Sequence, residues 1–376
     1  MEPRDKKRNA WRNVLFFSII LLVFCVADLT REDIFFSESE NRILVQKPRF
    51  SMESLFSGEY MKDYEEYVND QFVSRDNWIT LKTYTDILLQ KKEINGVYLA
   101  KDDYLIEQHL PQDYSQEMIE GKLELLGELV KEYPQTQVML VPTADNILLE
   151  KLPAQAPYFD QKELLDQVEG KVGELQVINV FDALTEHAQE EIYYRTDHHW
   201  TTRGAYYAYM EWARVNNFSP VRYPLDSLQT VTEDFRGTLY SKINLPVEGE
   251  TIQMFPQTEV LPVKITYDMG VSSESFYEEK YLAGKNKYGY FLDDIHGLVE
   301  IETTSPIRKQ LFVIKDSYAN TMLPLLATHY EKIYVLDLRY FNGKLFDFMQ
   351  SCDEYGNMDV LVLYNCIHFL EDFEYK

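Results

Sequence analysis

The sequence of 376 residues contains only three cysteines, Cys25, Cys352 and Cys366. Three cysteines cannot form the disulfide framework of a small secreted domain, and Cys25 lies inside an apolar segment. Cys352 and Cys366 could pair, but two reduced and buried thiols fit the sequence at least as well. The chain also lacks HExxH and CxxC motifs, so we expect no metal site and no other cofactor. Five of the seven histidines are scattered along the chain: His109, His187, His296, His329 and His368.

Positive charge is scarce. The chain has 37 Lys and Arg residues against 62 Asp and Glu residues, which gives a net charge of −25. Such a surface repels a phosphate backbone, so nucleic acid is excluded as a partner. The sequence shows neither an internal repeat nor a low-complexity segment. Its hydrophobic content of 45% and aromatic content of 14% are typical of a globular protein with one large core or two smaller ones.

The basic residues that do occur gather at the N-terminus, before the apolar segment 13–27, which ends at Asp28. This order predicts a cytoplasmic tail at 1–12, a signal-anchor at 13–27 and an extracytoplasmic body. We therefore expect a single-pass protein of the cell membrane. About 15 apolar residues are also typical of a cleaved signal peptide, so a secreted form is the alternative. The basic residues are Arg4, Lys6, Lys7, Arg8 and Arg12.

The rest of the chain divides into two parts. Residues 28–94 read as a linker followed by a helical stalk, because 52–90 carry apolar residues at helical spacing. Residues 95–376 predict an α/β fold with a doubly wound parallel sheet and an irregular β-containing insertion at about 222–308. Five apolar runs are the expected strands, at 138–142, 177–181, 311–316, 332–338 and 359–364. The expected helices are at 115–133, 161–175, 317–329 and 344–349.

The segment "YYRTDHHWTTRGAYY" at 193–207 is the first candidate for chemistry. If Thr202 caps a following helix and 196–200 are extended, Asp197 and His199 share one face and His198 points away. A carboxylate beside an imidazole fixes its tautomer and supports a general base. A metal site and a pair of hydrogen-bonded wall residues are the alternatives.

The second candidate is "LFVIKDSYAN" at 311–320, where an expected strand runs into a helix. Ligands bind at such carboxyl ends in α/β sheets, so Ser317 is a candidate nucleophile. The backbone N–H groups of Ser317 and Tyr318 could hold an oxyanion. The alternative is an ordinary helix cap. Nearby, Arg203 could bind a carboxylate of the substrate or of the protein, and Trp200 could be a sugar platform or a core residue.

These and three further segments resemble the DHHW protein family, which is related to alginate O-acetyltransferases of the SGNH-hydrolase-like type. The segments are "ENR" at 40–42, "TDHHWTTRGAYYAY" at 196–209, "DFRGTLYSK" at 234–242, "KYGYFLDDIHGLVEI" at 287–301 and "VIKDSYANTMLPLLATHYEKIYVLDLRYF" at 313–341. The resemblance implies an SGNH-like fold with Asp197, His199 and Ser317 as catalytic residues. The Asp-x-His pair precedes the serine, as in the acetyltransferase branch.

Two departures from the SGNH pattern stand out. Lys315 occupies the position where the serine block usually has glycine, and separate oxyanion Gly and Asn blocks are not recognisable. Asn320 or Asn365 could serve as an oxyanion donor. His296, within "DDIHGL", either faces the site or is a loop histidine.

The expected function is extracytoplasmic O-acetyl transfer, through an acyl-serine, to a hydroxyl of a cell-surface or exported polysaccharide. Because acetyl donors are made inside the cell, the resemblance implies a membrane-bound O-acyltransferase as partner. One alternative is a polysaccharide O-acetyl esterase with the same triad. Another is a non-catalytic surface protein that binds glycans through its aromatic residues, which include 28 tyrosines.

Overall fold

The computed structural model describes residues 3–37, 42–256, 263–268, 270–354, 356 and 358–375. Two residues of the "ENR" segment, 40 and 41, lie outside this range. The chain divides into two compact units. One comprises Met1–Gln90 and Ile243–Leu245, and the other comprises Lys91–Lys242 and Pro246–Lys376.

The N-terminal unit is largely helical. Helix α1 (Pro3–Thr30) contains the stretch Asn9–Asp28, whose 20 residues are long and apolar enough to cross a membrane. A short strand pair, β1 (Phe36–Ser37) with β2 (Arg42–Ile43), precedes three helices, α2 (Met52–Ser57), α3 (Glu59–Gln71) and α4 (Arg75–Leu88). The helical prediction for 52–90 is confirmed, but the helix is interrupted. Gly58 has a φ of 84°, a left-handed conformation that ends α2 and suits glycine.

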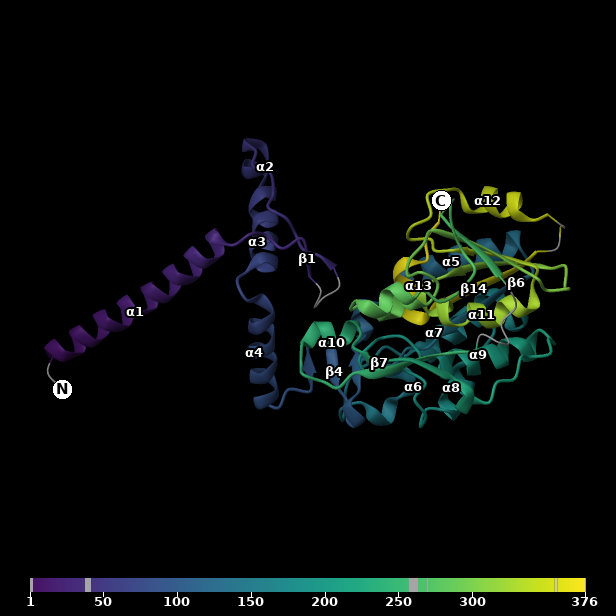
Figure 1. Cartoon of the computed structure of the whole chain (residues 1–376), viewed down its shortest axis with the longest axis horizontal. Helices are drawn as coiled ribbons and strands as arrows, with labels where there is room; N and C mark the ends of the chain where they lie inside the picture. The colour runs from purple at the N-terminus through teal and green to yellow at the C-terminus, as the bar shows by residue number, and fades with distance from the viewer. Residues whose placement is uncertain are drawn as a thin grey trace. The chain divides into compact units, whose positions relative to one another are not determined.

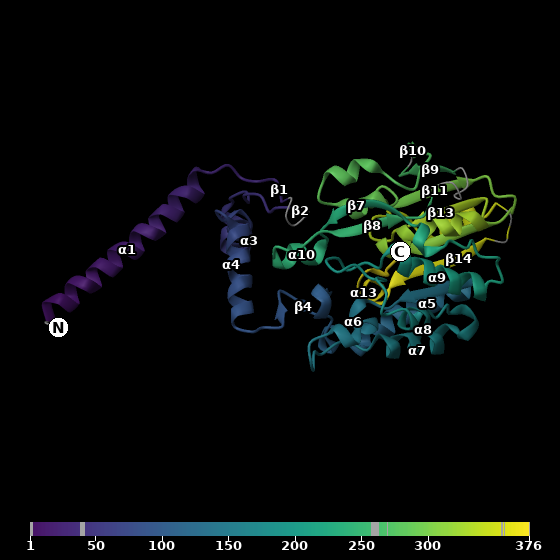
Figure 2. The ribbon, with the colours of Figure 1, turned by 60° about the horizontal axis from the view of Figure 1, so that its bottom comes forward.

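The larger unit is built on a seven-stranded mixed sheet in the order β10-β9-β11-β13-β12-β14-β6. Figure 2 labels β10, β9, β11, β13 and β14 of this sheet. The four strands from β13 to β6 are parallel and the others are antiparallel. Their bounds are β6 (Thr136–Val141), β9 (Val263–Tyr267), β10 (Val271–Ser273), β11 (Leu298–Thr303), β12 (Gln310–Lys315), β13 (Lys332–Leu336) and β14 (Asp359–Asn365). The α/β class is confirmed, and the predicted parallel sheet is found in part, because three antiparallel strands extend its parallel half.

The secondary structure of one predicted segment and the location of another differ from the sequence-based expectation. The apolar run 177–181 does not form a strand, because only Val177 makes an isolated bridge, to Val138, before a helix begins at Phe181. Conversely, the insertion at 222–308 is not separate from the sheet, since it supplies β9, β10 and β11. Its other strands, β7 (Gln229–Phe235) and β8 (Glu250–Met254), pair with each other. A further three-stranded sheet holds β3 (Glu93–Ile94), β4 (Val97–Leu99) and β5 (Leu105–Glu107).

Helices cover both faces of the large sheet (Figure 1). Along β12, Leu311 and Val313 belong to one core while Phe312 and Ile314 belong to the other, as strand alternation requires. Helix α9 (Thr202–Val215) packs into the first core. Helices α5 (Gln116–Glu132), α7 (Gln161–Val172), α12 (Leu345–Cys352) and α13 (Cys366–Asp372) pack into the second. Cys352 and Cys366 are buried there as free thiols, so the disulfide alternative is wrong.

The strand order creates a crevice at the end of β12. The chain passes from β12 to β13 on one side and then to β14 on the other, so β12 lies at a topological switch point. Ser317 follows β12 directly. The expected continuous helix 317–329 is instead a series of short helices, η9 (Ser317–Thr321), α11 (Leu323–Leu326) and η10 (Ala327–His329). Pro324 lacks the N–H that a continuous α-helix would direct at the Asn320 carbonyl.

Candidate active site

The segment around Asp197 folds into a tight loop. Tyr193 and Trp200 form an antiparallel bridge, and the Tyr194 N–H donates to the His199 carbonyl over 3.1 Å. The prediction that 196–200 are extended is therefore wrong, because residues 195–199 form bends between the two bridged ends. The helix cap is also shifted by one residue. Thr201, rather than Thr202, accepts a hydrogen bond from the Gly204 N–H, over 3.3 Å.

The loop joins Asp197, His199 and Ser317 in one chain of hydrogen bonds. His199 Nδ1 donates to Asp197 Oδ1 over 2.5 Å, and Ser317 Oγ lies 2.7 Å from His199 Nε2. Asp197 is 3% exposed and His199 is 5% exposed, so water screens this pair little. The three side chains come from two segments that are 118 residues apart. A hydroxyl, an imidazole and a buried carboxylate linked in this order form the arrangement that a serine triad requires.

The segment "DFRGTLYSK" holds Asp197 from behind. The Thr238 N–H and hydroxyl both donate to Asp197 Oδ2, over 2.8 and 3.2 Å. Gly237 is required there, because a Cβ at this position would lie 2.2 Å from the Asp197 Cβ. Burial raises the pKa of the Asp197 carboxyl, but the neighbouring imidazoles and the Thr238 N–H lower it more. The pKa therefore lies well below its usual range, and Asp197 is ionised.

Glu250 supports the same loop from β8. Its carboxylate accepts the N–H groups of Arg195 and Thr196, each over 2.7 Å, and also the Thr196 hydroxyl. Glu250 is 6% exposed, and this burial raises its pKa to about 7. Glu250 therefore fixes the backbone that leads into Asp197.

Tyr288, in the segment "KYGYFLDD", packs against one face of the His199 ring. Its ring stacks on the His199 imidazole with centroids 3.7 Å apart and an interplanar angle of 14°. Its hydroxyl donates to the Ser317 carbonyl over 3.4 Å. This contact leaves His199 one ring orientation, in which both nitrogens meet their partners.

Asp316 organises the residues around the nucleophile. Its buried carboxylate accepts the N–H groups of Tyr318 and Asn365 and the Nδ1–H of His368, each over 2.9 Å. The Tyr318 N–H, predicted as an oxyanion donor, is therefore already engaged. Asn365 lies at the carboxyl end of β14, next to β12 in the sheet, and lines a cavity beside Asp197. His368 was not identified from the sequence as a site residue.

Lys315, which departs from the expected glycine, has structural partners. Lys315 is buried, and its Nζ donates to Asn320 Oδ1 over 3.0 Å and lies 3.8 Å from Asp337 Oδ2. Asn320 Nδ2 donates in turn to the carbonyls of Phe291 and Asp294. The suggestion that Asn320 is an oxyanion donor is therefore wrong, because both ends of its amide are used structurally.

Trp200 and Arg203 also have structural partners. Trp200 is fully buried, and its Nε1–H donates to Thr321 Oγ1 over 2.8 Å, so it cannot stack on a sugar from solvent. The alternative that it is a core residue is the correct one. Arg203 donates to Glu190 Oε2 over 3.1 Å, so the carboxylate that it binds is one of the protein's own.

His296 lies among acidic residues rather than at the nucleophile. Its Nδ1 is 2.6 Å from Asp268 Oδ2 and its Nε2 is 3.2 Å from Asp293 Oδ2. Its ring stacks on Tyr267 with centroids 4.4 Å apart. Because both ring nitrogens are engaged, the loop-histidine alternative is the correct one.

His198 does not point away from the pair, as the extended conformation predicted. Its ring centroid lies 3.9 Å from that of His199, and its Nδ1 is 2.8 Å from Thr238 Oγ1. Burial and the nearby His199 lower its pKa to about 3, so His198 is neutral. Asp197, His198 and His199 each have one potential metal-ligand atom within 4.8 Å of the other two, which is close enough to consider a metal ion. However, the hydrogen bonds already described occupy Asp197 Oδ1 and the Nδ1 atoms of both histidines.

Comparison with known proteins places the chain in a family. Residues 97–336 match the family model "DHHW protein", and no curated protein gives a match. A DHHW family protein from Eubacterium siraeum has a similar structure, with 24% identity and a TM-score of 0.61 over 74% of this chain and 93% of that one. Bacillus cereus PatB1 with a sulfonyl adduct is 19% identical, with a TM-score of 0.58 over 73% and 97% of the two chains. The O-acetyltransferase domain of Pseudomonas putida AlgJ is 14% identical, with a TM-score of 0.45 over 75% and 94%. Since the family model spans more than half of the sequence, the chain belongs to the DHHW protein family.

Proposed function

We propose that this chain is a serine-dependent O-acyltransferase of the SGNH-hydrolase-like type, which transfers an acetyl group to a hydroxyl of a cell-surface or exported polysaccharide. The observation that carries the proposal is the continuous chain of hydrogen bonds from Asp197 through His199 to Ser317. A purely structural cap at Asp316-Ser317 needs no imidazole at the serine hydroxyl, and a glycan-binding surface needs no buried carboxylate behind that imidazole.

In the first step, Ser317 Oγ attacks the acetyl carbonyl while His199 Nε2 takes its proton. The resulting imidazolium is stabilised by the ionised Asp197, 2.5 Å from Nδ1. Collapse of the tetrahedral intermediate breaks the bond to the donor, and His199 returns the proton to the leaving group. In the second step, an acceptor hydroxyl gives its proton to His199 and attacks the acetyl-serine. The bond between Ser317 Oγ and the acetyl carbon then breaks, and His199 returns the proton to Ser317 Oγ. The products are the acetylated sugar and free Ser317.

The developing oxyanion requires hydrogen-bond donors near Ser317. We assign this role to the Ser317 backbone N–H and to the side-chain amide of Asn365. Asn365 Oδ1 caps α13 by accepting the N–H groups of Ile367 and His368, over 2.9 and 2.8 Å. This hydrogen bonding uses the amide oxygen and leaves the Nδ2–H donors for the cavity that Asn365 lines.

The N-terminal helix supports a location at the membrane. The stretch Asn9–Asp28 could be an anchor or a signal sequence, and the basic residues before it favour a cytoplasmic N-terminus. We propose a single-pass anchor, with residues 1–12 as the tail and the folded unit from about residue 95 as an extracytoplasmic catalytic domain. A membrane-bound O-acyltransferase would then supply the acetyl group from the cytoplasmic side.

Labelling with a fluorophosphonate tests the activated serine. The full chain, purified in detergent, is treated with the probe and analysed by intact mass and peptide mapping. We expect one adduct, on Ser317, which is lost in Ser317→Ala and in His199→Ala. Ser227→Ala is the matched control, because Ser227 is exposed and its hydroxyl donates only to the Pro224 carbonyl. No adduct on the wild-type chain, or an adduct that persists in Ser317→Ala, would contradict the proposal.

A second measurement separates transfer from hydrolysis. With an activated acetyl ester as donor, a transferase forms an acetylated sugar when glycan fragments are present, whereas an esterase forms only acetate. We expect acetylated sugar in an amount that rises with glycan concentration. Acetate alone at every glycan concentration would identify the chain as an esterase with the same triad.

A further inference from the structure

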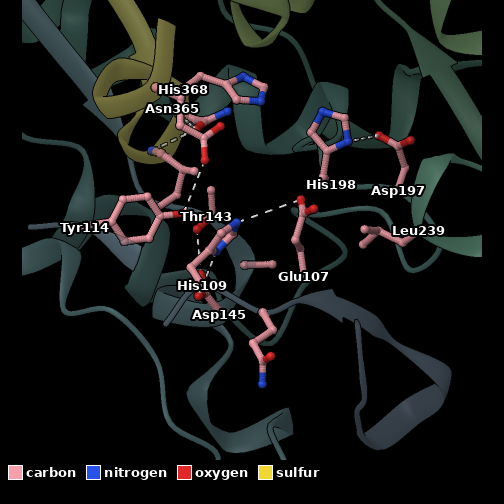
Figure 3. Close-up of a pocket in the computed structure, with 14 residues that line it drawn as sticks. Glu107, His109, Tyr114, Thr143, Asp145, Asp197, His198, Leu239, Asn365 and His368 are labelled. Atoms are coloured by element: carbon pink, nitrogen blue, oxygen red, sulfur yellow. Dashed lines mark hydrogen bonds and ion pairs between the residues drawn. The ribbon is translucent and has the colours of Figure 1, made fainter. Parts of the chain in front are cut away.

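A cavity of about 180 Å³ lies beside the Asp197–His199 pair (Figure 3). Asp197 and His198 form one wall, and Asn365 and His368 form another. The lining further includes Glu107, His109, Tyr114, Asp145 and Glu371. Residues that follow β6 and β14 therefore meet here, beyond the carboxyl ends of the parallel strands, where α/β sheets bind their ligands.

Each of the three histidines in the cavity is held by its Nδ1 atom. His109 Nδ1 lies 3.0 Å from Asp145 Oδ2, and His368 Nδ1 lies 2.9 Å from Asp316 Oδ2. For His198 the partner is Thr238 Oγ1, at 2.8 Å. Since all three Nδ1 atoms are used, Nε2 is the atom that each ring can present to a ligand.

The Nε2 atoms offer both kinds of hydrogen bond. Although burial lowers them, the adjacent carboxylates raise the pKa values of His109 and His368, which favours the protonated rings, whose Nε2–H groups are donors. The Thr238 hydroxyl donates its proton to Asp197, so it must accept one from His198 Nδ1. The neutral His198 therefore presents Nε2 as an acceptor.

The geometry does not suit a metal ion. His109 Nε2 is 3.9 Å from Glu107 Oε2, which is beyond hydrogen-bond distance, and a metal site needs at least one more ligand atom beside these two. Within the described ranges, no combination of His109, His198, His368 and Glu107 brings three ligand atoms within 4.8 Å. The cavity thus has polar groups that face an open space larger than an ion.

The charge of the cavity excludes anions. Four carboxylates line it, those of Glu107, Asp145, Asp197 and Glu371, and they outnumber the imidazoles of His109 and His368 even when both of these rings are protonated. Burial raises the pKa of Glu107, but the positive groups around it, including Lys242, hold it at about 2, so it is ionised. A ligand with a carboxylate or phosphate would meet net negative charge at short range.

We propose that this cavity is the acceptor subsite and takes one sugar ring that carries no negative charge, either a neutral hexose or an amino sugar. The inference rests on the proposed function and specifies its substrate. Hydroxyl groups both donate and accept, so they match a lining that alternates imidazolium donors with carboxylate and imidazole acceptors. The volume is below the 300–1,000 Å³ typical of drug-sized ligands, which limits the occupant to about one ring. The lining includes Asp197, which bonds to His199, and His368, which bonds to Asp316 next to Ser317, so the cavity adjoins the proposed transfer site although neither Ser317 nor His199 lines it.

A competition among three acceptors tests the proposal. The full chain in detergent receives an activated acetyl ester and the methyl glycosides of glucose, glucosamine or glucuronate, and mass spectrometry measures the acetylated sugar. We expect transfer to the neutral or the amino sugar to exceed transfer to the uronate by about tenfold or more, because charge repulsion discriminates against the wrong acceptor. In Glu107→Gln and Glu371→Gln, we expect the discrimination against uronate to fall several-fold. Glu124→Gln, an exposed position on α5, is the control and should keep it.

The outcomes separate this inference from the proposed function. Transfer to the uronate at the rate of the neutral sugar would overturn the acceptor assignment, as would Ser317 labelling without transfer to any of the three sugars. Stoichiometric metal in the purified chain that is lost in Glu107→Gln would also overturn it, in favour of a metal site. Failure of Ser317 labelling itself would instead overturn the proposed function. If Glu107→Gln does not fold, Glu371→Gln still provides the test. Glu371 is exposed at the edge of the cavity, so its replacement should not prevent folding.

Discussion

Replacing Gly237 by alanine tests how closely the triad depends on the backbone behind it. The new Cβ would lie 2.2 Å from the Asp197 Cβ and 2.3 Å from Asp197 Oδ2. Carbon atoms that do not share a bond pack about 3.5–4.0 Å apart, so Asp197 or its support must move by about 1 Å or more. Such a shift breaks the 2.8 Å hydrogen bond from the Thr238 N–H or the 2.5 Å bond to His199. Misplacement by about 1 Å can reduce a rate by roughly 10²-fold, which is the loss we expect.

The assay is the second-order rate of fluorophosphonate labelling at Ser317, measured below the melting temperature of each variant. We expect Gly237→Ala to unfold at a lower temperature, with a cost of about 1–3 kcal/mol for overpacking. Gly121→Ala is the control, because an added Cβ there meets no described atom within 4 Å. In α5 it should stabilise the fold by about 0.5–1 kcal/mol and leave labelling unchanged. Labelling of folded Gly237→Ala at the wild-type rate would refute the reasoning.

Three further perturbations follow from the structure. In Asp197→Asn, either orientation of the amide places its NH₂ group against a donor, the His199 Nδ1–H or the Thr238 N–H. Labelling of Ser317 should therefore slow by roughly 10³–10⁴-fold. A labelling rate near that of the wild type would exclude a role for the carboxylate. Glu250→Gln loses an acceptor for the Arg195 and Thr196 N–H groups, so denaturant unfolding at pH 8 should show a loss of about 1–3 kcal/mol. Because the pKa of Glu250 is raised from 4.5 to about 7, the folded state holds the extra proton. The free energy of unfolding of the wild type should therefore fall as the pH rises from 4.5 to about 7. The Glu250→Gln variant should lack this decrease. Thiol titration of the denatured chain without reductant should detect Cys352 and Cys366 as free thiols, and their absence would indicate a disulfide.

The parts of the site that could be predicted are those encoded by local sequence. Asp197 and His199 are two residues apart, and Ser317 follows an apolar strand, so each lies in a recognisable segment. The pairing of Asp197 with His199 was expected from an extended strand, but a tight loop produces it. Because only one residue separates Asp197 from His199, either conformation can bring the carboxylate to the imidazole. The position of His198 depends on which conformation forms: an extended strand points it away from His199, whereas the loop places the two rings together. The sequence pattern therefore does not predict its contact with His199.

The supports of the triad come from distant segments, and the sequence carried a weaker signal for them. Thr238 lies 41 residues from Asp197, and Glu250 lies 54 residues from Thr196. Gly237, Thr238 and Tyr288 belong to segments that share the family resemblance, which could have identified them as candidates. Glu250 has no comparable signal, since one acidic residue in a β-rich insertion is ordinary.

Ambiguous composition explains the remaining differences. An apolar run such as 177–181 has the length of a strand, but whether it pairs depends on neighbours that the run does not encode. The insertion at 222–308 adds β9 and β11 to the sheet through long-range antiparallel pairing, which local patterns do not specify. Trp200 fits a sugar platform and a core equally well by residue type, and only its burial decides between them.

The most direct test of the account is detection of the acyl-enzyme. The full chain is mixed with an activated acetyl ester, quenched in acid within the first turnover and digested for peptide mapping. We predict an acetyl group on Ser317 that disappears when a neutral sugar acceptor is added before the quench, with matching appearance of acetylated sugar. An unmodified Ser317 in a chain that nevertheless transfers or releases acetate would contradict the acyl-serine mechanism.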